Sequence, residues 1–529
     1  MAITRRTLLG TGTAAAATAL YAPSLRAQDP DRIRAAFAAG GPRKVDPNWT
    51  TQGADNWATE QMFEQLVRPP NGQFGQRPED FEPYLAESWS ASDDARTWTF
   101  QLRQGVQFHK GYGEMTSDDV VASFERAMTE GTSVSIYQNI KSVDASGPYE
   151  VSISLTNPDP LFLGAIVFSN NVSVVSKKAL EERGEDFQTD SIGTGPYQLD
   201  KFDIEKGIYL SRFADYWGEP AKIEKIDILY IADTTARTLA LMSGDVDMIE
   251  GVRAPGWVPS IMAQNPDLLF DMTAPGSFNT LFFNLLREPL NNIKVRQAIA
   301  HGINKEEIVQ ALAPMSNISY TLNPPHYPTG FELEELPEEL RYEHDPDKAK
   351  ALLAEAGFPN GFSIRVNTSQ REDYASQHLI IQEQLRAIGI DIDLNIMDHS
   401  AYHADNRKDL NTLPINSSSL PPIPLDVYNR YASSNAEVKN DGSGGTNYAH
   451  YGVVIPGVDD KLSAMLQATS FDDYVSIGRE VELQIQRDLP MLGLPTLSYT
   501  VVRNPRLDIG YEVKGGYARW RLDKATFVD

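Results

Sequence analysis

Apolar residues follow two periodicities along this chain. At 97–102 and 390–396 apolar and polar residues alternate, which predicts half-buried strands because successive side chains of a strand point to opposite faces. At 346–356 and 472–489 apolar residues recur every three or four positions, which predicts amphipathic helices. Because strand and helix patterns alternate over most of the chain, the sequence predicts an α/β protein.

The stretch 191–250 shows this alternation clearly. Two β-branched runs, Ile208–Phe213 and Ile226–Ile231, predict strands. The pattern then becomes that of a helix, which should end near Gly244, and a third extended run follows over 246–249. Such a unit buries one side against other elements, so we expect it inside a larger lobe.

Length and composition narrow the class of protein. With 529 residues the chain is too long for one core, and 41% hydrophobic residues are typical of globular domains. The 47 basic and 72 acidic residues give a net charge of −25, which would repel nucleic acid. The chain has no cysteine, which excludes disulfides, thiolate metal sites and cysteine nucleophiles.

The N-terminus has the features of an export signal. Arg5 and Arg6 precede a moderately apolar stretch, 8–20, and a cleavage site is plausible at 25–27. We therefore expect a signal peptide over 1–27; it resembles the twin-arginine type, with an ordinary secretory signal as the alternative. Because no cysteine follows, we expect a soluble periplasmic protein without a lipid anchor.

A series of motifs then occurs in a fixed order. They are LAESW (85–89), LRQGVQFH (102–109), TSDDV (116–120), GTGPY (193–197), DYWG (215–218), ARTLALMSGDVDMI (236–249), FNLLREPLNNIKVRQAIAHGINKEEI (283–308) and DPDKAKALLAEAGFPNGF (345–362). In this order and spacing they resemble the periplasmic solute-binding proteins of peptide and nickel ABC importers, known as solute-binding protein family 5.

The resemblance implies a two-lobed α/β fold of the Venus-flytrap type, class II-like, with an extra subdomain in lobe I. The implied parts are 28–75, 190–273 and 490–529 for lobe I, 76–189 for its subdomain and 274–489 for lobe II. The chain would cross between the lobes near 271–277 and near 488–495. Closure of two lobes over a ligand is the movement that such a fold permits.

The same resemblance implies a function. We expect a monomer that captures a solute, most simply an oligopeptide, and delivers it to the permease subunits of an ABC importer in the inner membrane. No cofactor, metal or nucleic acid is implied. A chemoreceptor would be an alternative partner for the same fold.

Ligand contacts are expected where the lobes meet. The resemblance implies ligand-facing positions at Thr51 and Gly53, a cleft position at Tyr137, and entry into lobe II at Phe278 and Asn279. For Phe278 and for Trp257, core packing is an equal alternative. Trp49 and Trp57 are flanked by polar residues, which favours stacking on a ligand over core packing.

One segment departs from the family pattern. Peptide-binding relatives carry an aspartate, which pairs with the peptide's amine, in the segment that here spans 413–422. This chain has no acid between Asp409 and Asp426 and offers Asn416, Ser417, Ser418 and Ser419 instead. A buried ammonium without a partner costs several kcal/mol, so the segment favours neutral ligands such as an oligosaccharide, while a peptide stays the expectation from the family.

Motifs for catalysis are weak. The sequence contains no Gly-x-Ser-x-Gly, no phosphate-binding GxxxxGK[ST] and no HExxH. His399 and His403 have the spacing of two metal ligands on a helix, but two polar surface histidines are the preferred interpretation. We therefore expect a binding protein and keep a secreted hydrolase as the alternative.

Overall fold

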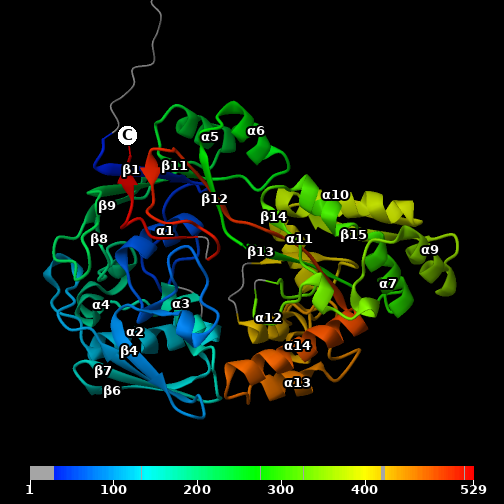
Figure 1. The fold of residues 1–529 in the computed structure, drawn as a ribbon, viewed down its shortest axis with the longest axis horizontal. Helices are drawn as coiled ribbons and strands as arrows, with labels where there is room; N and C mark the ends of the chain where they lie inside the picture. The colour runs from blue at the N-terminus through cyan, green and yellow to red at the C-terminus, as the bar shows by residue number, and fades with distance from the viewer. Residues whose placement is uncertain are drawn as a thin grey trace, which may run out of the picture.

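The structure is a computed structural model that describes residues 29–528, except 133, 169, 275, 326, 419–422 and 517–518. The predicted signal peptide, 1–27, lies outside the described residues. Two lobes lie side by side, one formed largely by the N-terminal half and the other by later residues (Figure 1). Within the described part of the chain no helix is long and apolar enough to cross a membrane.

Lobe I is built on a seven-stranded mixed sheet. In spatial order its strands are β12 (Leu269–Met272), β19 (Thr500–Arg503), β11 (Met248–Glu250), β1 (Arg32–Phe37), β10 (Lys225–Tyr230), β9 (Gly207–Arg212) and β8 (Tyr197–Asp203). The central strand β1 runs parallel to both β10 and β11. It is buried on both faces because α1 (Gly53–Met62) covers one face, while α5 (Thr234–Met242) and α6 (Trp257–Gln264) cover the other.

The subdomain adds a four-stranded antiparallel sheet to lobe I. Its elements are β4 (Ala86–Ala91), β5 (Thr97–Leu102), β7 (Glu150–Leu155), β6 (Ile140–Gly147), α2 (Ser117–Thr129), α3 (Phe162–Phe168) and α4 (Lys177–Arg183), with the short pair β2 (Val67–Arg68) and β3 (Glu82–Pro83) at its border. One apolar cluster runs from the subdomain into lobe I without a break, so the two form one packed body.

Lobe II has two small sheets with helices around them. The first contains β14 (Ser316–Asn317), β18 (Met491–Leu497), β13 (Ser277–Phe282) and β17 (Ile415–Ser418), and the second pairs β15 (Phe362–Ser369) with β16 (Ile390–Met397). The helices are α7 (Ile293–Gly302), α8 (Lys305–Ala311), α9 (Pro346–Glu355), α10 (Glu372–Ala387), α11 (His399–Arg407), α12 (Pro424–Tyr431), α13 (Val458–Met465) and α14 (Phe471–Asp488). The predicted two-lobed α/β fold is confirmed.

The second crossing between the lobes lies later than the sequence indicated. We assigned 490–529 to lobe I, but β18 pairs with β13 and β14 in the sheet of lobe II. The chain therefore crosses at 273–276 and again at 498–499, between β18 and β19. The two crossings are in close contact, since a Cβ on Gly276 (φ 78°) would lie 2.2 Å from the Leu497 carbonyl oxygen. The sequence of an apolar strand that is buried on both faces does not indicate which sheet the strand joins.

Candidate functional site

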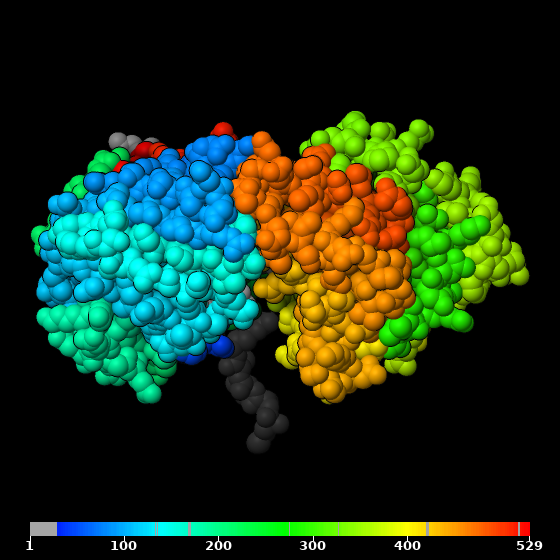
Figure 2. All heavy atoms as spheres, turned by 90° about the horizontal axis from the view of Figure 1, so that it is seen from below, coloured from blue at the N-terminus to red at the C-terminus, as the bar shows by residue number. Residues whose placement is uncertain are grey.

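The two lobes meet along a seam between the subdomain and the helices of lobe II. Leu161, just before α3, is buried in the apolar cluster of lobe II, and Ile423, just before α12, packs into the core of lobe I. At the outer end of the seam the Arg77 guanidinium lies 3.5 Å from Asp472 and over the ring of Phe471. Figure 2 shows the contact, with a groove open between the halves on one side.

The predicted contact residues of lobe II lie in the strand pair β13 and β17, directly after the first crossing. Phe278 lies opposite Ser418, and Asn279 opposite Ser417. Residues that we predicted from two distant segments are therefore neighbours in one sheet. Because β17 is the edge strand, its outer backbone groups are not paired within the sheet; those of Ile415 are instead bonded to the Tyr402 hydroxyl, at 3.0 and 2.6 Å.

Two tyrosines hold β17 in place. The Tyr374 hydroxyl accepts a hydrogen bond from the Ser417 backbone N–H at 3.2 Å and donates to its carbonyl at 3.3 Å. The Asn416 amide donates to the Tyr431 hydroxyl at 2.6 Å and to the Ser418 hydroxyl at 3.2 Å. The segment thus presents amide and hydroxyl groups held in a fixed geometry. Ser419 lies outside the described residues.

Asn279 keeps hydrogen-bonding capacity in this strand pair. Its amide nitrogen donates to the Pro495 carbonyl at 2.7 Å, whereas its side-chain oxygen has no partner among the residues that the structure describes. The neighbouring Thr280 hydroxyl is likewise without a partner in the described chain. Both side chains are buried, so a ligand able to donate a hydrogen bond would offset a desolvation cost already present.

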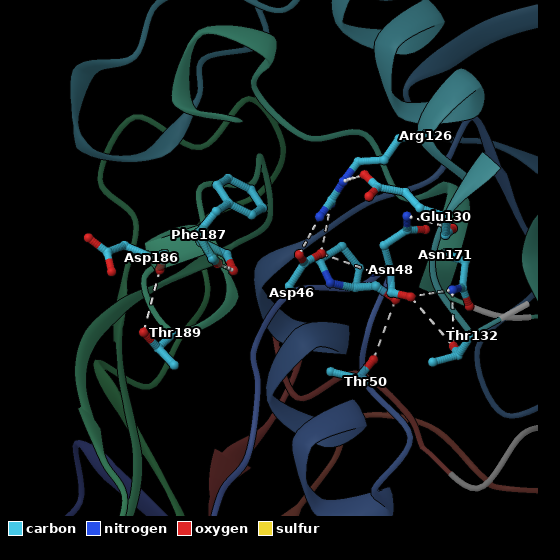
Figure 3. A network of polar contacts seen from close by, with 12 residues as sticks. Asp46, Asn48, Thr50, Arg126, Glu130, Thr132, Asn171, Asp186, Phe187 and Thr189 are labelled. Atoms are coloured by element: carbon cyan, nitrogen blue, oxygen red, sulfur yellow. Dashed lines mark hydrogen bonds and ion pairs between the residues drawn. The ribbon is translucent and has the colours of Figure 1, made fainter. Parts of the chain in front are cut away.

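The loop 46–52 of lobe I is anchored to the subdomain on one side. Asp46 accepts two hydrogen bonds from Arg126 of α2, at 2.9 and 2.6 Å (Figure 3). The Asn48 carbonyl accepts from the Thr132 backbone at 3.1 Å and from the Asn171 amide at 2.9 Å. A Cβ on Gly131 would approach that carbonyl to 2.5 Å, so the loop is fitted closely against the subdomain.

The outer side of this loop is accessible. Trp49 is half-buried, with the Lys44 ammonium 4.7 Å from its ring centroid. Thr51 is exposed, and a Cβ on Gly53 would have no described heavy atom within 4 Å. These three predicted residues therefore lie where a ligand can reach them.

Trp57 is not accessible. Because α1 begins at Gly53, Trp57 lies on the inner face of this helix, with its ring 5.0 Å from Phe37 and 4.8 Å from Trp520. Its indole N–H donates to the Tyr499 hydroxyl at 3.2 Å. The stacking that we predicted for Trp57 is made with core residues in this structure.

The remaining predicted aromatic residues are also buried or half-buried. Tyr137 belongs to the core of lobe I. Phe278 is 2% exposed and packs edge-on against Tyr327 with 4.6 Å between ring centroids. Trp257, at the first turn of α6, is half-buried between the core of lobe II and the outer cluster of lobe I. Phe278 and Trp257 thus brace the strand pair and the crossing.

A buried acid that the sequence analysis missed lies in lobe II. Glu482 of α14 accepts hydrogen bonds from the backbone of Leu322 and Asn323, at 3.1 and 3.0 Å, and from the Tyr428 hydroxyl at 3.0 Å. Burial raises the pKa of Glu482 to about 7. Its signal in the sequence is a single acid in the apolar stripe of α14, four positions after Gly478.

The two histidines considered as metal ligands pack against each other. The rings of His399 and His403 are perpendicular, with 4.5 Å between centroids, and the His399 Nδ1 lies 2.9 Å from the Ser369 hydroxyl. Over the described residues no three histidine, aspartate or glutamate side chains form a group that could hold a metal ion.

Comparisons with known proteins bear on this arrangement. A model of bacterial extracellular solute-binding proteins, family 5 Middle, matches residues 80–438. The glutathione-binding protein GsiB of Shigella flexneri serotype 5b (strain 8401) is 30% identical over 322 residues, which cover 59% of this chain and 61% of that protein. The match thus spans less than two thirds of this relative.

Solved structures match over greater lengths. The PBP/SBP MoaA from A.tumefacien R10, in complex with mannopinic acid, is 28% identical with a TM-score of 0.76, and the match covers 94% of this chain and 100% of that one. A dipeptide binding protein from pseudoalteromonas sp. SM9913, in complex with Met-Leu, is 22% identical with a TM-score of 0.73 and the same coverage. At 22% identity, the match to the dipeptide binding protein shows a likeness of fold alone.

Proposed function

Because this chain belongs to the bacterial extracellular solute-binding proteins of family 5, we propose that it captures a solute between its lobes and delivers it to the permease subunits of an ABC importer. The observation that carries the proposal is the pair of adjacent crossings at 273–276 and 498–499. They leave the lobes otherwise joined by side-chain contacts across the seam, which an opening movement can break and restore.

The proposal includes where and how the protein works. It acts as a monomer in the periplasm after removal of 1–27 by the twin-arginine route, without a lipid anchor and without catalytic turnover. The net charge of −25 favours solubility and disfavours nucleic acid as a partner.

The solute is a small organic molecule that can accept and donate hydrogen bonds along β17. A peptide or a sugar-derived acid fits, since similar proteins bind glutathione and mannopinic acid. An oligosaccharide is the second candidate, because Asn416, Ser417 and Ser418 offer only uncharged groups. Peptide binding then requires that the amine reach solvent or another acid.

Closure on binding is the test of this function. Small-angle X-ray scattering of the protein, with and without the compounds that co-purify with it, should show a smaller radius of gyration in the bound form. By mass action the ligand should also raise the free energy of unfolding, by about 2.7 kcal/mol at a hundredfold excess over Kd, and so raise the melting temperature. Steady conversion of the bound compound, lost on mutation in the cleft, would instead support a hydrolase.

A peptide, its N-acetylated form and a neutral oligosaccharide distinguish the ligand classes. If no acid of the cleft holds the amine, acetylation leaves peptide affinity unchanged where the amine reaches solvent and raises it where the amine is buried. Loss of binding on acetylation would show that an acid elsewhere holds the amine, and would overturn the significance given to the segment Asn416–Ser418.

A further inference from the structure

A hollow of about 680 Å³, open to solvent, lies in lobe I beside the first crossing. Its walls come from the end of α1 and the loop after it, from α3, and from residues 511, 515–516 and 519–521 near the C-terminus. A Cβ on Gly515, at its rim, would lie 3.0 Å from the Ala274 carbonyl oxygen in the crossing. The nearby Phe74 ring lies 6.4 Å from that of Tyr327 in lobe II. The hollow therefore borders the cleft.

Three donors in this lining have no hydrogen-bond partner within the described part of the chain: the Tyr84 hydroxyl, the Trp520 indole N–H and Nη1 of Arg521. The exposed fractions of these residues are 4%, 5% and 6%. An unsatisfied buried donor lowers stability, so three in one hollow indicate a group that the protein alone does not supply.

The donors are held firmly. Gln61 of α1 donates to the Trp520 carbonyl at 3.0 Å and accepts from the Leu522 backbone at 2.9 Å. Nη2 of Arg521 donates to the Phe63 carbonyl at 2.6 Å, which leaves Nη1 as the unsatisfied end of the guanidinium. Because both sides of the segment are fixed to α1, the donors are pre-organised for a ligand.

Arginines outnumber acids around the hollow. Arg68, Arg519 and Arg521 line it together with one acid, Glu60, and Arg68 is also paired with Glu82 at 3.0 Å. Glu60 already accepts from Arg519 at 3.0 Å and lies 3.8 Å from Arg521. The guanidinium carbons of Arg68 and Arg521 lie 5.0 and 4.9 Å from the centroid of the Tyr84 ring. An anion is therefore attracted to this hollow, whereas the net charge of the chain, −25, repels one elsewhere.

We propose that this hollow binds a carboxylate of the transported solute, with Tyr84, Trp520 and Arg521 as its hydrogen-bond donors. A carboxylate has about four lone-pair sites and satisfies all three donors, whereas an amide carbonyl has two. Burial raises the pKa of Tyr84 well above its usual value, so its hydroxyl keeps the proton that it donates. The inference rests on the proposed function and adds that the solute is an acid.

Matched acids and amides test the charge requirement. The full-length protein is titrated calorimetrically with glutathione, Met-Leu and mannopinic acid, each beside the compound in which its carboxylates are carboxamides. We expect at least one acid to bind tenfold or more tightly than its amide. Equal behaviour of acid and amide in all three pairs, including the case that neither binds, would overturn the proposal.

Tyr84→Phe tests the donors, because it removes only a hydroxyl that lacks a protein partner. We expect it to leave the ligand-free protein as stable as before or more stable, and to weaken binding of the acid by tenfold or more. Trp520→Phe should also reduce the preference for acid over amide. Unchanged affinity in both variants would contradict the proposal.

Tyr216→Phe is the matched control. The Tyr216 hydroxyl donates to Glu64 at 2.7 Å, so its removal should lower stability and leave the ratio of acid to amide affinity unchanged. If a neutral solute closes the lobes and acids have no advantage, the proposed function stands and this inference fails. If no solute closes them, the proposed function itself fails.

Discussion

Arg126 and Asp46 form a buried two-bond ion pair between α2 and the loop that carries Trp49. The Asp46 side chain is fully buried and that of Arg126 is 15% exposed. The pair joins α2 of the subdomain to the loop 46–52 of lobe I (Figure 3). Through it the subdomain, which lies outside the main sheet, fixes the position of this loop.

The first prediction concerns this ion pair. Asp46→Asn leaves a buried guanidinium facing an amide, and breaking a buried pair from one side costs about 3–5 kcal/mol. We expect urea unfolding to show a loss of that size. Glu182→Gln in the exposed pair Lys178–Glu182, where the side chains are 64% and 51% exposed, is the control and should change stability by less than about 1 kcal/mol. Equal effects of the two changes would contradict the anchoring role.

The second prediction separates the two tryptophans of the N-terminal segment. Trp57→Ala empties a core position and should lower stability by about 3–5 kcal/mol, whereas Trp49→Ala removes a half-buried ring and should cost much less. For ligand affinity we expect the opposite order: Trp49→Ala should bind the ligand more weakly than the wild type, and Trp57→Phe should bind it about as tightly as the wild type. Thermal unfolding and calorimetry on the same samples decide between ligand contact and core packing.

The third prediction uses two buried histidines. Burial lowers the pKa of His109 and of His378 to about 4. The Gly193 backbone N–H lies 3.3 Å from Nδ1 of His109, and Nε2 lies 2.9 Å from the Gly195 carbonyl, so the ring is neutral and donates from Nε2. Since the unfolded state takes up the proton first, stability is full above pH 6.5 and falls as the pH approaches 4.

The contribution of His109 is isolated by comparison with a variant. His109→Gln should be less stable than wild type at pH 7.5 and should lose less of its remaining stability between pH 6.5 and 4.5. His344→Gln, at an exposed position, should follow the wild-type curve. Parallel curves for wild type and His109→Gln would show that His109 does not titrate in this range.

The fourth prediction links closure to pH. Asp159 of the subdomain and Asp426 of α12 lie at the seam. Burial raises the pKa of Asp159 to about 7, and the negative charge of Asp426 acts in the same direction. Burial raises the pKa of Asp426 to about 6, although the positive charge of Arg430 acts to lower it. The Tyr474 hydroxyl lies near both acids. Contact between the lobes buries both acids and raises their pKa values, so the form with the lobes in contact binds protons more readily than the open form. Closure is therefore favoured as the pH falls through 7 to 6 and disfavoured at higher pH.

Scattering of the ligand-free protein at pH 5.5 and 8 measures this dependence. We expect a smaller radius of gyration at pH 5.5, and a reduced difference for Asp426→Asn. Asp472→Asn is the control, because Asp472 lies at the same seam but its side chain is 85% exposed. A pH response that survives Asp426→Asn would rule out this acid as its source.

Much of the fold was predictable because its signals are local. The helix α2 begins where Thr116 and Asp119 form a capping box, with the Thr116 backbone N–H donating to Asp119 at 2.9 Å. Residues three positions apart meet in any helix, so the sequence alone is enough. The alternation of 390–396 likewise specifies β16, whose partner is the nearby β15.

Trp57 shows where local reasoning fails. It stands beside Asp55 and Asn56, a polar setting that predicts an exposed loop. In the structure Asp55 is 1% exposed and accepts hydrogen bonds from the backbones of Arg43 and Lys44 at 3.1 and 3.2 Å. Its carboxylate is satisfied by backbone N–H groups eleven and twelve positions earlier in the chain, which allows the helix that carries Trp57 to pack against the core.

The sequence by itself determined the α/β class, most of the elements, the family resemblance and the absence of an acid between Asp409 and Asp426. Only the tertiary structure decided that Asn416 and Ser417 lie beside Asn279, and that Tyr84 and Arg521 line one hollow. Sequence periodicity reports which side of an element is buried, but not what it is buried against. Whether a buried donor has a partner depends on residues hundreds of positions away, and this is decided when the chain packs.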